Sequence, residues 1–148
     1  EEGNVVTPLP EYTQSREMPG DPLQAQYPFQ CIGHHYKART HSSYGNVEWL
    51  KEAHPQHIWV NAMDAAKRGI EHGEQMEVWN DRGSLTSPAY VTQRIAPGVI
   101  SVPQGAWYKP DDKGVDRGGS VNVLTSHFPT PYSKANGQHS ALVDIKKV

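Results

Sequence analysis

Cysteine is almost absent from this sequence, since Cys31 is the only one among 148 residues. A single thiol excludes an internal disulfide, and it excludes an iron–sulfur cluster or structural zinc site built from the cysteines of this chain alone. Long apolar runs are missing too, and none approaches the roughly 18 residues of a transmembrane helix. We therefore expect a soluble chain with no direct membrane insertion.

An excess of positive charge is also lacking. The sequence has 14 Lys and Arg against 16 Asp and Glu, which leaves a formal net charge of -2. No lysine- or arginine-rich run is present to neutralise a series of phosphates, so we expect no nucleic acid partner. The signatures of serine hydrolases, P-loop proteins and Rossmann folds are absent as well.

The composition changes after the first 26 residues, which contain four prolines and few large apolar groups. Such a segment buries too little surface to offset its ordering entropy. We expect a flexible arm or linker over 1–26, followed by one domain over 27–148. That domain is long enough to form a single hydrophobic core.

Short apolar patterns predict a mainly β domain with short helices. Alternating residues predict strands at 27–33, 57–61, 98–104 and 139–147, and a strand–turn–strand unit around "NDRG" in 73–95. Trp59 and Trp79 lie in these patterns, and we expect both in the core. Closing the strands into a barrel would remove their exposed edges.

Two helices are expected between these strands. "NVEWLKEA" predicts a short helix capped by Asn46, with Val47 and Leu50 turned inward. The segment 62–70 predicts a second helix, ended by Gly69.

Three segments, 33–46, 104–125 and 126–138, show neither the 3.6-residue period of a helix nor the alternation of a strand. They are rich in glycine and hydrogen-bonding side chains. Polar loops on a rigid scaffold often carry binding residues, and glycines let backbone N–H groups approach phosphates or heterocycle edges. A solvated surface loop has the same composition, so both interpretations stay open at this point.

Two further patterns suggest metal sites but lack the full ligand sets. Eight histidines are present, and His34, His35 and His41 are close in sequence. Adjacent residues of an extended chain point to opposite faces, so we expect no metal ligands among them. "DDKGVD" lacks the closing glutamate of a calcium loop, and we expect its aspartates to be solvated.

Four ordered motifs carry more information than any of these patterns: "RTHSSYGN", "HIWVNAMDAAKRGIEHGEQMEVWNDRG", "APGVISVPQGAWY" and "GGSVNVLT". Over residues 27–147 this order resembles the C-terminal molybdopterin dinucleotide-binding domain of the dimethyl sulfoxide reductase family. The resemblance implies a double-psi β-barrel that binds part of a molybdenum bis(molybdopterin guanine dinucleotide) cofactor. It also implies a complete subunit that reduces S-oxides or N-oxides by oxygen-atom transfer, with the isolated domain not catalytic.

The resemblance also implies which residues contact the cofactor. The loop after the first strand would bind the pterin and its diphosphate, Asn122 would read a base or pterin edge, and Trp107 would offer a stacking surface. The full set is Gly33, His34, His35, Tyr36, Arg39, Thr40, His41, Ser42, Gln104, Trp107, Asn122, Thr125, Gln138 and His139. No catalytic residue and no metal ligand are implied in this chain.

The partners implied by the resemblance are the remaining domains of the same catalytic subunit, an iron–sulfur electron-transfer subunit and a membrane anchor subunit. The complete enzyme would be periplasmic or peripheral to the bacterial inner membrane. Two alternatives remain: a free-standing β-barrel that acts as a small-ligand or interaction module without redox activity, and an independent enzyme that uses the histidines with a metal.

Overall fold

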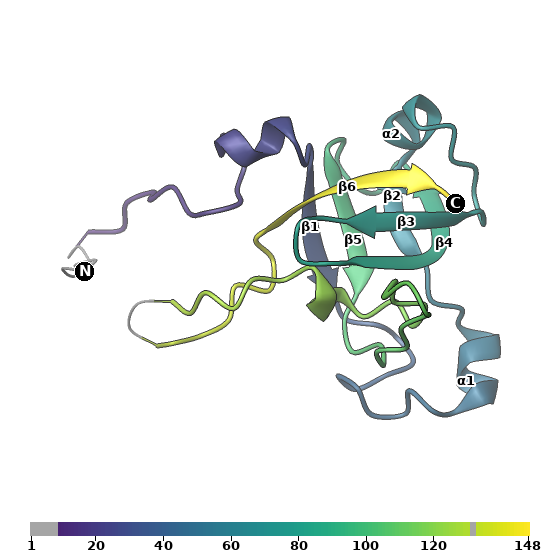
Figure 1. The fold of residues 1–148 in the computed structure, drawn as a ribbon. Coiled ribbons are helices and arrows are strands. Elements are labelled where there is room, and N and C mark those ends of the chain that lie inside the picture. The colour runs from purple at the N-terminus through teal and green to yellow at the C-terminus, as the bar shows by residue number, and fades with distance from the viewer. Residues whose placement is uncertain (1–8, 131–132) are drawn as a thin grey trace.

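The computed structural model describes residues 9–130 and 133–148. Within these residues six strands close into a barrel in the order β1-β5-β2-β4-β3-β6 (Figure 1). The strands are β1 Phe29–His34, β2 Ile58–Asn61, β3 Gln75–Trp79, β4 Ser84–Thr92, β5 Val99–Pro103 and β6 Ala141–Lys147. Two short α-helices, α1 Glu48–Ala53 and α2 Ala62–Lys67, and two 3-10 turns, η1 Pro22–Ala25 and η2 Val121–Val123, complete the described elements. The prediction of a mainly β barrel with short helices is confirmed.

The strand pairings bring distant parts of the chain together. β1 pairs with β5, and β2 with β4, in parallel, whereas the other neighbours are antiparallel. β3 and β4 form the hairpin predicted around "NDRG", and Asn80 N–H donates to the Gly83 carbonyl oxygen at 3.0 Å. β6 pairs with both β1 and β3, so the last strand closes the barrel.

Alternate residues of every strand fill the barrel interior. Ile58 and Val60 of β2, Met76 and Val78 of β3, and Ile100 of β5 are fully buried. Their packing provides the main stabilisation of the barrel. Cys31 is buried among them, and this burial raises the pKa of its thiol to about 12.

The prediction that Trp59 and Trp79 belong to the core is wrong. Both are only half-buried, because each follows an inward-facing residue and successive side chains of a strand alternate between faces. Trp59 lies on the outer face, where its ring centroid is 5.3 Å from that of Tyr90. Trp79 lies under Lys146, whose Nζ is 5.0 Å from the indole centroid.

The two helices differ in how well they agree with the predictions made from the sequence. Asn61 caps α2 by accepting from Met63 N–H at 2.9 Å, and α2 ends before Gly69, which has a φ of 64°. α1 is capped by Val47, without a side-chain hydrogen bond, so the predicted Asn46 cap is wrong. No residue of α1 is buried. The helix lies on the surface and does not contribute to the core.

Candidate functional site

A cavity of about 340 Å³ lies where β1 and β5 end and β6 begins. It is lined by residues from all three segments that lack a regular pattern: Gly33, His35, His41, Ser42, Gln104, Gly105, Val121, Asn122, Thr125, Gln138 and His139. All of these except Gly105 and Val121 belong to the set that the sequence resemblance implied. The fold therefore collects nine of the 14 candidate residues around one space.

Strand pairing explains why these segments meet. β1 and β5 are parallel and their registers end together at His34 and Pro103, so the loops that follow them leave the same end of the barrel. Gln104 N–H extends the ladder by donating to the His34 carbonyl at 2.9 Å. β6 runs antiparallel to β1, which brings His139 beside Gly33, and the Gly33 N–H donates to His139 Nδ1 at 3.2 Å.

The five other candidates do not line the cavity, and most of them contact residues of the loops that do. Arg39 donates from Nη2 to Gln56 Oε1 at 2.8 Å and to the Gln104 carbonyl at 3.0 Å. Its guanidinium carbon lies 4.2 Å from the centroid of the Tyr36 ring. Burial lowers the pKa of Arg39 and raises that of Tyr36. The buried Nε of Arg39 has no hydrogen-bond partner among the described residues.

His34 faces the barrel wall. Its Nδ1 lies 2.7 Å from Ser101 Oγ, and its ring centroid is 5.5 Å from that of Trp59. Burial lowers the pKa of His34, and the positive charge of Arg39 lowers it further. The neutral imidazole is therefore the favoured form near pH 7.

Thr40 and Trp107 connect loop segments. Thr40 forms an isolated bridge with Ser43, which folds the first loop back on itself. Trp107 is 55% exposed, and its Nε1 donates to the Ser42 carbonyl at 2.8 Å. Both residues shape the loop that carries His41 and Ser42.

Asp116 organises the long loop 104–125. This side chain is fully buried, and its carboxylate accepts hydrogen bonds from the N–H groups of Lys109 at 2.7 Å, Gly118 at 2.8 Å and Ser120 at 2.6 Å. The expectation that the aspartates of "DDKGVD" are solvated is wrong for Asp116. Aspartate side chains often accept from the backbone N–H two residues on, as Asp116 does from Gly118, and this tendency could have indicated a turn here.

Gly105 allows the two largest loops to touch. Its φ is 83°, and a Cβ on this residue would collide with the carbonyl oxygen of His41. Both the backbone conformation and the close approach require glycine here. The sequence reasoning did not single out Gly105, because nothing local distinguishes it from a glycine in an open turn.

The lining of the cavity suits an anionic, hydrogen-bonding ligand. Three of the lining residues carry an imidazole, three carry a side-chain amide and two carry a hydroxyl, and no carboxylate is among the described lining residues. His35 and His41 lie with ring centroids 5.8 Å apart. In the described part of the chain, no group of three or more His, Cys, Asp or Glu residues is placed to hold a metal ion. Within the same residues, no helix is long and apolar enough to cross a bilayer.

Comparison with known proteins agrees with this arrangement. A family model described as "Molydopterin dinucleotide binding domain" matches residues 29–142. The chain belongs to this family of molybdopterin dinucleotide-binding domains, which confirms the resemblance found in its motifs.

The relatives are much longer proteins. Dimethyl sulfoxide reductase DmsA of Escherichia coli K12 is 51% identical over 147 residues, which cover 99% of this chain and 18% of the relative. Trimethylamine-N-oxide reductase 1 of the same strain is 36% identical over 138 residues, with 86% of this chain and 16% of the relative covered. The chain thus spans less than a fifth of the length of the curated relatives it matches.

A solved structure has the same fold. Acetylene hydratase from Pelobacter acetylenicus aligns with a TM-score of 0.80 at 19% identity, over 95% of this chain and 21% of the hydratase. The six-stranded closed barrel is a double-psi β-barrel, as the resemblance implied.

Proposed function

We propose that the cavity binds molybdopterin guanine dinucleotide, as one part of the site for a molybdenum bis(molybdopterin guanine dinucleotide) cofactor. One observation carries this proposal: nine candidate residues from three separate segments line a single cavity. Two of them, Gly33 and His139, are 106 positions apart and share a hydrogen bond.

The chemistry of the donors fits such a cofactor. Imidazole N–H and hydroxyl groups, as on His35, His41 and Ser42, are suitable donors to diphosphate oxygens. The amides of Asn122 and Gln138 can both donate and accept, which suits the edge of a guanine or pterin ring. The absence of carboxylates from the described lining avoids repulsion of the diphosphate.

The other candidates would act one step away from the ligand. Arg39 holds the Gln104 carbonyl and adds positive charge behind the loop wall. When bound, the cofactor supplies two-electron oxygen-atom transfer at molybdenum, while the protein supplies binding and orientation. This chain would bind and orient the dinucleotide, with no catalytic side chain of its own.

The complete protein is proposed to reduce S-oxides or N-oxides, because its relatives are named dimethyl sulfoxide and trimethylamine-N-oxide reductases. The remaining domains of that subunit would enclose the rest of the cofactor. An iron–sulfur subunit and a membrane anchor subunit would deliver electrons, at a periplasmic or membrane-peripheral location.

Isothermal titration calorimetry of the 148-residue chain with guanosine 5′-diphosphate tests the proposal. Asn122→Ala is expected to weaken binding by about tenfold, which corresponds to the loss of about one hydrogen bond to the ligand. Asn136→Ala is the matched control, because Asn136 is exposed and does not line the cavity. Equal affinity of Asn122→Ala and the unmodified chain would contradict the assignment of the cavity. Equal affinity for adenosine 5′-diphosphate would contradict the guanine form.

A further inference from the structure

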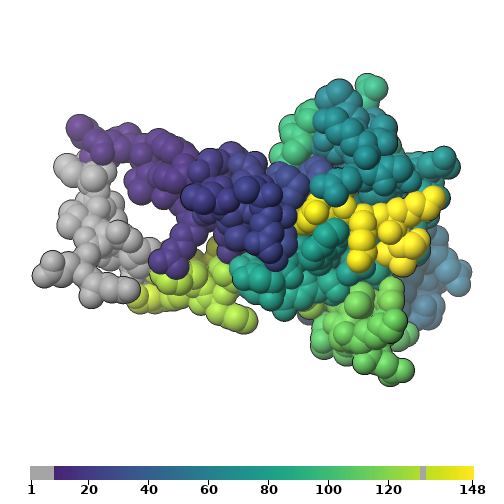
Figure 2. Space-filling model, turned by 45° about the horizontal axis from the view of Figure 1, so that its top comes forward, coloured from purple at the N-terminus to yellow at the C-terminus, as the bar shows by residue number. Residues whose placement is uncertain are grey.

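Two residues of the N-terminal segment, Arg16 and Met18, contact the ends of segment 126–140, which carries Gln138 and His139 of the cavity. The described residues of the N-terminal segment, from 9 onward, lie beside the described residues of this loop (Figure 2). The guanidinium carbon of Arg16 lies 3.9 Å from the centroid of Phe128, and Ser140 Oγ donates to Met18 Sδ at 3.7 Å. Residues 16–18 are called the strap below.

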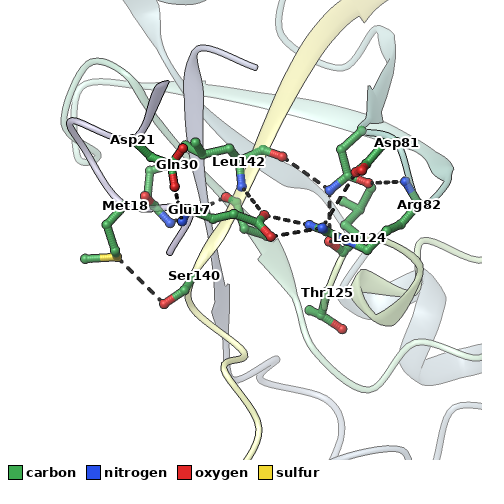
Figure 3. Close-up of polar contacts among 12 residues, drawn as sticks. Glu17, Met18, Asp21, Gln30, Asp81, Arg82, Leu124, Thr125, Ser140 and Leu142 are labelled. Carbon is green, nitrogen blue, oxygen red and sulfur yellow. Dashed lines mark hydrogen bonds and ion pairs between the residues drawn. The ribbon is translucent and has the colours of Figure 1, made fainter. Parts of the chain in front are cut away.

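Glu17, the middle residue of the strap, forms a two-pronged ion pair with Arg82 (Figure 3). Arg82 Nη1 donates to Oε1 at 2.9 Å, and Nη2 donates to Oε2 at 2.6 Å. The side chains of Glu17 and Arg82 are only 12% and 24% exposed, so solvent screens this pair less than a surface pair. Asp81, at 3.6 Å from Arg82 Nη1, is 63% exposed and makes the weaker contact.

The same carboxylate supports the start of β6. The pairing of β3 with β6 ends at Trp79 and Asp144, so the backbone of Leu142 lies beyond the end of that ladder. Leu142 N–H donates to Glu17 Oε2 at 3.0 Å, and its carbonyl accepts from Asn80 Nδ2 at 3.2 Å. Side chains thus satisfy backbone groups that a strand would otherwise satisfy.

Arg82 extends this support to the second cavity segment. Its Nε donates to the Leu124 carbonyl at 2.9 Å, and Asn80 Nδ2 donates to the same oxygen at 2.9 Å. Leu124 directly precedes Thr125, which lines the cavity. One ion pair therefore links the strap to two of the segments that line the cavity.

The backbone at Glu17 is held in an unusual conformation. Its φ of 52° is uncommon for a residue with a side chain. Asp21 Oδ2 stabilises this turn by accepting from Glu17 N–H at 2.9 Å. Such conformations persist where the surrounding structure requires them and are often associated with function.

We propose that Glu17 is a positioning residue for the dinucleotide cavity: through Arg82 and Leu142 it sets the position of the segments that carry Thr125 and His139. The link from this positioning to ligand affinity rests on the proposed function. The positioning itself can be measured without a ligand.

The first measurement is amide hydrogen–deuterium exchange of the 148-residue chain. Glu17→Gln keeps the shape of the side chain but removes its charge, and it is expected to raise exchange about fivefold at 124–125 and 138–142, because a charge-assisted contact is weakened. Exchange in β2 and β5 should stay unchanged. Glu11→Gln is the control, since Glu11 is exposed in the same N-terminal segment and the charge change is identical.

Two results of this measurement would overturn the proposal. Unchanged exchange at 124–125 and 138–142 would show that Glu17 holds neither segment. An equal rise in β2 and β5 would show general destabilisation instead of local positioning. If Glu17→Gln does not fold, Arg82→Lys serves the same purpose, because it keeps the charge but loses the fork and the Nε contact.

The second measurement is the affinity for guanosine 5′-diphosphate. Glu17→Gln is expected to weaken binding about fivefold, although Glu17 does not line the cavity. If Glu17→Gln increases local exchange but leaves the affinity unchanged, the proposal that Glu17 positions the cavity for ligand binding is wrong. Absence of binding by the unmodified chain would overturn the nucleotide assignment alone, and the exchange result would still decide the role of Glu17.

Discussion

Trp107 donates a hydrogen bond from its indole Nε1 to the carbonyl oxygen of Ser42, at 2.8 Å. This contact joins the two largest loops of the cavity at residues 65 positions apart. The Trp107 ring also packs against Gly45, where a Cβ would collide with the indole. The indole therefore connects the two loops both through its hydrogen bond and through its flat surface.

Trp107→Phe separates these two roles. Phenylalanine keeps an aromatic surface but lacks the N–H donor, so Ser42 would lose its partner. We expect affinity for guanosine 5′-diphosphate to fall about fivefold, close to the loss in Trp107→Ala, as measured by calorimetry. Trp49→Phe in the exposed helix α1 is the control. Unchanged affinity in Trp107→Phe would favour stacking as the main role of Trp107.

Asp116→Ala is expected to destabilise the domain strongly. The substitution leaves three backbone N–H groups of the loop without their acceptor, and each such group costs about 1 kcal/mol or more. The free energy of unfolding, measured in urea, should decrease by about 3 kcal/mol. The value for Asp116→Asn should lie between those of Asp116→Ala and the unmodified chain. The exposed Asp112, changed to Asn, should alter it by less than about 0.5 kcal/mol. A loss below about 1 kcal/mol in Asp116→Ala would contradict the organising role.

His34 should make the stability of the domain depend on pH. Its pKa in the folded chain is lowered from 6.5 by burial and then by Arg39. As the pH falls below 6.5, the unfolded chain takes up a proton at His34 that the folded chain does not, so stability decreases until the pH reaches the lower folded pKa.

His34→Gln should remove this contribution. Denaturation in urea at a series of pH values below 6.5 should give a shallower decrease in the free energy of unfolding than in the unmodified chain. His127→Gln is the control, because His127 is exposed. An identical slope in the His34 variant and the unmodified chain would show that His34 does not titrate differently on folding.

Local patterns predicted the elements that depend on neighbours in sequence. The β3–β4 hairpin follows from alternation on both sides of "NDRG", and the end of α2 follows from Gly69. Trp59 was misplaced because Ile58, Trp59 and Val60 are all apolar, so alternation cannot say which side of the strand faces inward.

The site was predictable as a set of segments but not as a set of side-chain directions. The lack of a regular pattern indicated the three loops, the family resemblance indicated the candidate residues, and nine of those candidates line one cavity. Arg39 and His34 contact Gln56 and Ser101 instead of lining the cavity. These partners are distant in sequence, so no local pattern could indicate the direction of either side chain. The roles of Asp116 and Glu17 likewise depend on contacts that no local pattern contains.

The pairing of β6 with both β1 and β3 has a consequence for biosynthesis. While β6 is still inside the ribosome, β1 and β3 each lack a neighbour and the barrel stays open. Gln138 and His139 lie within three residues of the start of β6, so the cavity gains its last wall only when that strand docks. If the cavity binds the dinucleotide as proposed, a nascent chain whose β6 is still in the exit tunnel would lack part of the binding site, and loading would follow the docking of that strand.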